Sequence, residues 1–290
     1  MFEKKTLRLT WPQWQGGVNP NYVFGSELLA VIAPPSEKDE CVTISVNQDF
    51  CVPMETVDGI DHGNALLVQM KAAQQILEEK QPTHLIVFGG DCSVTQVPFD
   101  YLSGKYGAKM GVLWLDAHPD CSSPKTTSHL HEMPLSNLLG LNPESSITKV
   151  CNPVSPGRVM LGGLIEEELR EMDMTCKLLN LRIASPEKLR ASVQPVLEWI
   201  KDCGIEYVAV HWDLDVLTPE DFRSIYPAEP YTRVEDFGSA VGRMTLQDVC
   251  TVLQAVSEQA EIVGLSITEH LPWDAFNLRK ALNQISIFQP

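Results

Sequence analysis

The sequence predicts an α/β fold in which a parallel β-sheet is covered by helices on both faces. Two observations support this prediction. Short apolar runs with the length of strands alternate along the 290-residue chain with longer segments that carry a helical stripe. Most of these short runs also lack the polar alternation of a half-exposed strand, so we expect both of their faces to be buried, as they are in parallel sheets.

The predicted strands begin with a short alternating segment near the N-terminus, residues 6–10. Apolar runs that follow or precede a helical pattern supply five more strands: residues 84–88, 110–115, 158–161, 207–210 and 262–267. Each run is bounded at its carboxyl end by a Gly-Gly pair or by a polar residue, which is where a buried strand must give way to a loop.

Three segments between these strands predict helices. Residues 64–79 place Leu66, Met70, Ala73 and Leu77 on one face at helical spacing. A Ser-Pro start signal predicts a helix over residues 186–201, and a threonine placed as an N-cap predicts another over 245–260.

Composition limits the class of protein. With 44% hydrophobic residues and no linker or low-complexity run, the chain is expected to form a single domain over residues 1–290. The formal net charge of −16 argues against nucleic acid and anionic membranes, because binding to phosphate requires clustered Lys and Arg. An acidic chain fits a small cationic substrate or bound cations, and it equally fits ordinary solubility.

The sequence predicts a cytoplasmic protein. Its eight cysteines form no C-x-x-C pair, and a chain of this length does not need disulfides to fold, so reduced thiols are expected. No apolar segment resembles a secretion signal. None approaches the roughly 18 continuous apolar residues of a membrane span.

Acidic residues follow the predicted strands at the point where each strand ends. Asp91, Asp116, Asp213 and Glu269 all occupy such positions. Ligands of open parallel sheets bind at the carboxyl edge of the strands. The sequence therefore predicts a polar site at this edge.

Two short clusters give this site its chemistry. In an extended segment alternate residues point to one side, so Asp116, His118 and Asp120 face one point. A second cluster, His211-Trp212-Asp213-Leu214-Asp215, repeats the spacing. A lone D-x-D motif is often a helix cap or a solvated turn, but two such clusters would repel each other strongly without a cation. Mixed oxygen and nitrogen ligands suit Mn²⁺, and Fe²⁺ or Zn²⁺ less well.

Four motifs together resemble the ureohydrolase family, which contains arginase, agmatinase and formiminoglutamase. They occur in the family's order between about residues 83 and 272: Gly89-Gly90-Asp91-Cys92-Ser93, Asp116-Ala117-His118-Pro119-Asp120, His131-Glu132-Met133-Pro134-Leu135 and Asp213-Leu214-Asp215. The resemblance implies a three-layer α/β/α fold with a central parallel sheet of about eight strands. It also implies a homo-oligomer with a binuclear Mn²⁺ centre that hydrolyses a small cationic guanidino substrate to urea and an amine.

The resemblance also implies the metal ligands. Asp116 and Asp213 match the residues that bridge the two ions in the family. His118 and Asp215 match the remaining ligands of one ion, and Asp120 matches a ligand of the other. Water activated between the two cations would then attack the guanidinium carbon.

Three residues are the predicted catalytic residues: Asp120, His131 and Glu269. Glu269 matches the carboxylate that pairs with the guanidinium, for which a charge-assisted bidentate contact is suited. His131 matches the proton-shuttling histidine, which can act as general acid for the leaving amine. His129 is its local competitor.

Cys92 stands where the family has its first metal-binding histidine. A thiolate ligand would favour Zn²⁺, Fe²⁺ or Ni²⁺ over Mn²⁺. Three outcomes are open: Cys92 binds metal, or it leaves the first ion weak or absent, or a single ion is held by Asp116, His118, Asp213 and Asp215. A buried free cysteine beside a glycine turn can also serve packing alone.

Other departures affect the substrate. Ser122, Ser128 and Glu166 are the predicted substrate contacts, in segments where the sequence differs from the family pattern. His211, Trp212 and Trp273 could narrow or reshape the pocket, although aromatic residues in such positions more often serve packing.

The sequence is consistent with three functional hypotheses. The leading hypothesis is a metal-dependent hydrolase that cleaves a C–N bond in a guanidino, amidino or formimino compound. The alternative is a catalytically degenerate relative that serves as a binding or scaffold protein, for which Cys92 is the main argument. A metal-dependent deacetylase or amidohydrolase on a related architecture ranks last, because the paired histidines expected of the deacetylases are not visible.

Overall fold

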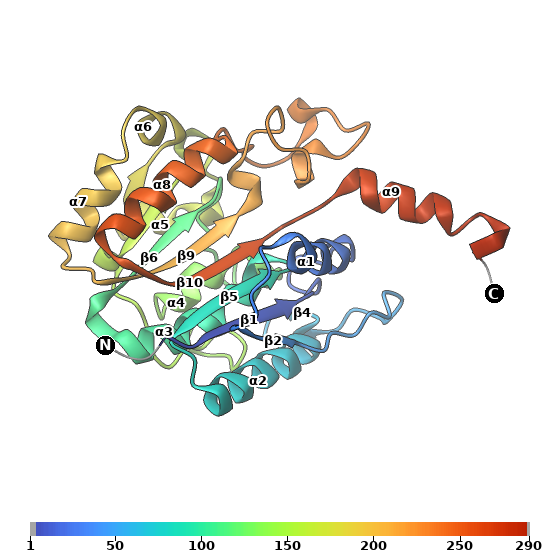
Figure 1. Cartoon of the computed structure of the whole chain (residues 1–290), viewed down its shortest axis with the longest axis horizontal. Helices are drawn as coiled ribbons and strands as arrows, with labels where there is room; N and C mark the ends of the chain where they lie inside the picture. Colours follow the sequence, from blue (N-terminus) through green and yellow to red (C-terminus); the bar gives the residue numbers. More distant parts are fainter. Residues whose placement is uncertain (1–3, 289–290) are drawn as a thin grey trace.

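The computed structural model describes residues 4–288, and its centre is a sheet of eight parallel strands (Figure 1). The strands in chain order are β1 (Thr6–Trp11), β2 (Glu40–Thr43), β5 (His84–Gly89), β6 (Met110–Leu115), β7 (Val159–Gly162), β8 (Arg182–Ala184), β9 (Tyr207–Asp213) and β10 (Glu261–Thr268). Their order across the sheet is β2-β1-β5-β10-β9-β6-β7-β8. A separate antiparallel pair joins β3 (Thr56–Val57) to β4 (Ile60–Asp61).

Helices cover both faces of this sheet. In chain order they are α1 (Asn21–Ile32), α2 (Gly63–Lys80), α3 (Gln96–Tyr106), α4 (Pro134–Leu138), α5 (Thr175–Leu178), α6 (Pro186–Ala191), α7 (Gln194–Asp202), α8 (Leu246–Gln259) and α9 (Trp273–Leu282). Helices α2, α3 and α4 share one apolar cluster with the sheet, and α1, α6, α7 and α8 share another. The two clusters lie on opposite faces, with α2 below the sheet and α8 above it in Figure 1. This confirms the predicted three-layer α/β/α fold.

Strand β6 illustrates why the central strands read as continuous apolar runs. Every residue of Met110–Leu115 is buried. Val112 and Trp114 belong to one apolar cluster, whereas Leu113 and Leu115 belong to the other, so alternate side chains serve both layers. The register with neighbouring strands therefore fixes which residues reach each face.

The predicted helix over 186–201 is wrong as one element, because the structure divides it into α6 and α7. Ser185 caps α6 by accepting a hydrogen bond from the Lys188 amide at 3.4 Å. At Ser192 the backbone is extended, and α7 begins beside Pro195, which has no N–H to continue the preceding helix. The other two helix predictions agree with α2 and α8 within one residue at each end.

Glycines after β5 bring the next segment close to its neighbours. A Cβ at Gly90 would lie 1.7 Å from the carbonyl oxygen of Gln13, so only glycine fits here. This turn sets the position of Asp91 and Cys92. No helix in the part of the chain that the structure describes is long and apolar enough to cross a membrane.

Candidate metal centre

The acidic residues at the strand ends meet over the middle of the sheet. Strands β5, β10, β9 and β6 are consecutive neighbours, and all run in the same direction. Their carboxyl ends therefore open at one edge, beneath a cavity of ≈ 620 Å³. Seven of the eight sequence-predicted metal and catalytic residues line this cavity: Cys92, His118, Asp120, His131, Asp213, Asp215 and Glu269. The eighth, Asp116, is buried and lies next to Cys92 and Asp213.

Two groups of side chains here could each hold a metal ion. Cys92, Asp116, His211 and Asp213 place one potential ligand atom each within 4.8 Å of one another. A second group with the same spacing consists of Asp116, His118 and Asp215. Asp116 belongs to both groups, which is the position of a bridging carboxylate.

Burial and mutual repulsion dominate the electrostatics of the carboxylates. Burial, followed by the charge of Asp215, raises the pKa of Asp116 from 3.8 to about 6. Burial and neighbouring carboxylates likewise raise the pKa of Asp120, Asp213 and Glu269 well above the ordinary range. These acids must therefore take up protons or be neutralised by a cation.

His118 and Asp215 form the exception within this group. His118 Nδ1 lies 3.1 Å from Asp215 Oδ2. Burial opposes ionisation of both residues, but their attraction raises the pKa of His118 well above its usual value and lowers that of Asp215. A single imidazolium cannot neutralise the remaining carboxylates.

Several buried polar atoms of these residues also lack hydrogen-bond partners within residues 4–288. Three of these atoms belong to the two ligand groups: His118 Nε2, His211 Nε2 and Asp215 Oδ1. The fourth is Oδ2 of Asp120, which also lines the cavity. Buried polar atoms are nearly always hydrogen-bonded, so a cluster of exceptions needs an explanation. Nitrogen and oxygen atoms of this kind are metal ligands, so the residues fit a divalent ion.

Two residues of the site hold strained backbone conformations. Asp120 has φ 46° and Glu269 has φ 61°, both in the left-handed region that favours glycine. The Glu269 amide donates to the Gly90 carbonyl at 2.8 Å, and the Tyr22 hydroxyl donates to the Glu269 carboxylate. Neighbouring elements therefore fix this carboxylate over the cavity.

Cys92 is fully enclosed among the carboxylates. Its Sγ donates to Asp213 Oδ2 at 2.7 Å, and it also lies 3.8 Å from Glu269 Oε1. Burial, followed by the charge of Asp213, raises the pKa of the thiol well above its usual value. The thiol is therefore neutral, and it lies among carboxylates that could share an ion with it.

Both candidate proton-shuttling histidines line the cavity. His131 Nδ1 is 2.9 Å from the carbonyl oxygen of Gly16, to which it donates, so Nε2 remains as the atom that can exchange a proton. His129 lies 3.9 Å from Asp61 Oδ2 and stacks on His131 with ring centroids 5.6 Å apart.

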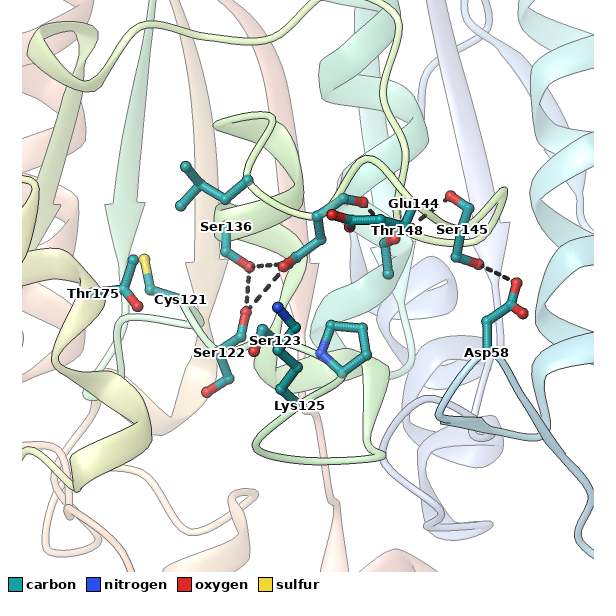
Figure 2. A pocket seen from close by; sticks show the side chains of 13 residues that line it. Asp58, Cys121, Ser122, Ser123, Lys125, Ser136, Glu144, Ser145, Thr148 and Thr175 are labelled. Atoms are coloured by element: carbon teal, nitrogen blue, oxygen red, sulfur yellow. Dashed lines mark hydrogen bonds between the residues drawn. The ribbon is translucent and has the colours of Figure 1, made fainter.

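The structure does not bring the three predicted substrate contacts into this cavity. Ser122 lines a second cavity of ≈ 520 Å³, together with Cys121 and Ser123 (Figure 2). Ser128 Oγ donates to Asp61 Oδ2 at 2.6 Å, and Glu166 pairs with Lys177. None of the three is among the residues that line the metal-binding cavity.

The structure adds three residues to the predicted site residues. His211 was part of the second sequence cluster and was expected to narrow the pocket, but it was not predicted as a ligand. In the structure it belongs to the first ligand group, two positions before Asp213 on β9. Tyr22 and Arg170 also line the cavity, and no motif signals them. Trp273 packs in a separate apolar cluster with Tyr22.

The sequence profile of the Arginase family matches residues 33–276. The chain is similar to an arginase of Entamoeba histolytica, with 27% identity over 213 residues that make up 69% of this chain and 72% of that protein. It is also similar to an arginase of Staphylococcus aureus, with 23% identity over 208 residues that make up 70% of this chain and 65% of that protein.

Solved structures show the same likeness. The crystal structure of the Entamoeba histolytica arginase in complex with L-ornithine superposes with a TM-score of 0.74 and 20% identity, covering 97% of both chains. At this identity the likeness shows the fold alone. The profile match extends over most of the 290 residues and agrees with the resemblance of the four motifs, so the chain belongs to the arginase family.

Proposed function

We propose that the protein is a metal-dependent hydrolase that cleaves a C–N bond in a guanidino or amidino compound. One observation carries this proposal: buried carboxylates beside an open cavity form two groups of potential metal ligands that share Asp116. Membership of a family whose named relatives are arginases supports the same reaction class.

The proposed metal centre uses the residues that the sequence predicted. Asp116 and Asp213 would be shared between two ions, His118 and Asp215 would complete one of them, and Asp120 would contribute to the other. When bound, divalent ions lower the pKa of water enough to provide a nucleophile near neutral pH. We propose Mn²⁺ from the family resemblance, with Zn²⁺, Fe²⁺ or Ni²⁺ as alternatives if Cys92 binds.

Glu269 and His131 have the proposed catalytic roles beside this centre. The Glu269 carboxylate, held by the Tyr22 hydroxyl, would pair with the planar guanidinium and orient its carbon. His131, anchored through Nδ1, would deliver a proton from Nε2 to the leaving amine.

The charge of the cavity supports a cationic substrate. Glu229 and Asp236 line its outer part. Arg170 also lines it, but its guanidinium is bound by Glu132 at 2.7 Å and by Asp173 at 2.8 Å. The net potential is therefore negative, which attracts a small cation. We also propose that the protein is cytoplasmic and forms a homo-oligomer.

Metal analysis and product release together test the proposal. Purified protein loaded with Mn²⁺ should contain one or two ions per chain and should release urea or ammonia from at least one member of a panel of guanidino and amidino compounds. Asp213→Ala should lose both the ions and the activity. The control Asp202→Ala, at an exposed ion pair with Arg182, should retain both.

The outcomes separate three readings. Protein that remains free of metal after loading would favour the scaffold alternative. Bound metal without turnover of any compound in the panel would refute the reaction class. Turnover that survives in Asp213→Ala would refute the assignment of the site.

A further inference from the structure

His211 occupies a position in the metal centre that the family motifs do not assign. It lies on β9 two residues before Asp213, so both side chains point to the same side of the strand. The ring is fully buried, with 0% exposure. One ring nitrogen of His211 lies with Cys92 Sγ and one oxygen each of Asp116 and Asp213 within 4.8 Å of one another.

The other nitrogen of the ring is already engaged. His211 Nδ1 is 2.8 Å from Thr95 Oγ1, which is itself 2.8 Å from Ser266 Oγ. This arrangement matches the outer contact of metal-binding histidines, in which one nitrogen is hydrogen-bonded and the other faces the ion. A chain of hydroxyl groups thus fixes the direction of Nε2.

Nε2 itself has no hydrogen-bond partner among residues 4–288. Its neighbour Asp116 Oδ2 is 4.0 Å away, too far for a hydrogen bond. The ring has two neutral tautomers. In the first, Nδ1 donates to Thr95, and the lone pair of Nε2 faces the Asp116 carboxylate. In the second, Nδ1 accepts from Thr95, and the proton on Nε2 has no acceptor. A cation between His211 and Asp116 satisfies both groups in the first case.

Trp114 holds the same two groups in place. Its ring stacks on His211 with centroids 3.7 Å apart and an interplanar angle of 16°. Its Nε1 donates to Asp116 Oδ2 at 3.0 Å. One buried side chain therefore orients a nitrogen and an oxygen toward the same point.

We propose that His211 Nε2 is a metal ligand and that, with Cys92 Sγ, Asp116 and Asp213, it forms a sulfur–nitrogen–oxygen site for one divalent ion. The inference rests on the proposed metal-dependent function and adds to it a ligand supplied by β9. It restores a histidine to the ion whose usual histidine is replaced by Cys92. The second group, Asp116, His118 and Asp215, contains no sulfur ligand. The two ions would therefore have different ligand types.

The geometry fits a four-coordinate ion after a small adjustment, with His211 in the place that Asp120 has in the proposed two-ion centre, because Asp120 belongs to neither ligand group. Ligands at about 2.0–2.3 Å from a tetrahedral ion lie roughly 3.3–3.8 Å apart. Binding would replace the 2.7 Å contact between Cys92 and Asp213 with two bonds to the ion, and the thiol proton would pass to solvent. A thiolate and an imidazole favour Zn²⁺, Fe²⁺ or Co²⁺ over Mn²⁺ at this position.

Co²⁺ binding to the full chain tests the inference, because it gives a spectrum that does not depend on activity. Wild-type protein should show a thiolate-to-Co²⁺ charge-transfer band and the strong visible absorption of a four-coordinate ion. His211→Asn retains a group that can bond to Thr95 but removes Nε2. This variant should bind the ion more than about 100-fold more weakly and lose the four-coordinate absorption.

Two further variants separate a ligand from a packing residue. Thr95→Val removes the hydroxyl beside Nδ1 and should weaken Co²⁺ binding by about 10–100-fold without abolishing the charge-transfer band. His84→Gln is the matched control, because His84 is also buried on the sheet but begins β5 at the opposite edge. It should leave the spectrum and the affinity unchanged.

The results distinguish this inference from the proposed function. Unchanged Co²⁺ affinity and spectrum in a folded His211→Asn variant would overturn the role of His211, whereas Asp213→Ala would still lose its metal. A charge-transfer band that is absent from wild-type protein containing bound Co²⁺ would remove Cys92 from the site. Wild-type protein that binds no ion would refute the proposed function itself.

Discussion

Removal of metal should make the stability of this protein fall as the pH rises. In the metal-free chain, burial and the nearby Asp215 carboxylate raise the pKa of Asp116 from 3.8 to about 6. The folded chain then holds a proton that the unfolded chain has released, so the free energy of unfolding decreases between these two pH values. A shift of two pKa units corresponds to about 3 kcal/mol from Asp116 alone.

The other shifts extend this trend. The raised pKa of Asp120, Asp213 and Glu269 continues the loss above pH 6, because burial disfavours their charged forms. His118 acts in the same direction, since the stabilisation from its raised pKa is present at low pH and is lost as the pH rises. Asp215, whose pKa is lowered, has the opposite sign but acts only near and below its ordinary pKa.

Urea denaturation of chelator-treated and metal-loaded protein, at a series of pH values from 3.8 to above about 6, measures the effect. The metal-loaded protein should show little of this slope, because the bound ion holds the carboxylates in their charged form. Asp116→Asn is the matched control and should reduce the slope of the metal-free protein. Metal-free stability that is level or increases over this range would refute the reasoning, as would an unchanged slope in Asp116→Asn.

Three further changes test packing, capping and substrate positioning. Trp199→Ala removes a fully buried ring and should cost about 3–5 kcal/mol in urea denaturation. Thr245→Ala breaks the capping box with Asp248 at the start of α8 and should cost about 1 kcal/mol in thermal unfolding, with metal content unchanged. Tyr22→Phe removes the hydroxyl that donates to Glu269 and should raise KM more than it lowers kcat; an unaltered KM would contradict the proposed role of Glu269.

The strands that sequence reasoning found and missed differ in burial. The central strands are buried on both faces, so their composition alone reveals them. Strands β2 and β8 form the two edges of the sheet, and each has exposed residues that interrupt an apolar run. An edge strand is set by pairing with its neighbour, which a local pattern does not report.

Some residues of the site could be predicted from the sequence, and others could not. Asp116, His118 and Asp120 could be predicted because they are close in sequence and follow one strand. Tyr22 reaches Glu269 across 247 positions, and such a contact depends on the packing of α1 against the sheet. Ser122 was expected at the substrate, but the loop after Asp120 directs it to another cavity, and loop direction cannot be read from residue types.

The polar residues at the carboxyl edge of the sheet do not stabilise the fold. Carboxylates with raised pKa values, unpartnered buried atoms and left-handed backbone at Asp120 and Glu269 each oppose folding, the last by about 1–3 kcal/mol per residue. Apolar side chains of similar volume would remove most of these costs. A divalent ion would offset these costs, because it would neutralise the acids and could bind the buried atoms of His118, Asp120 and Asp215 that lack partners. In the proposed centre, the same groups that destabilise the metal-free chain would therefore provide the affinity for the ion.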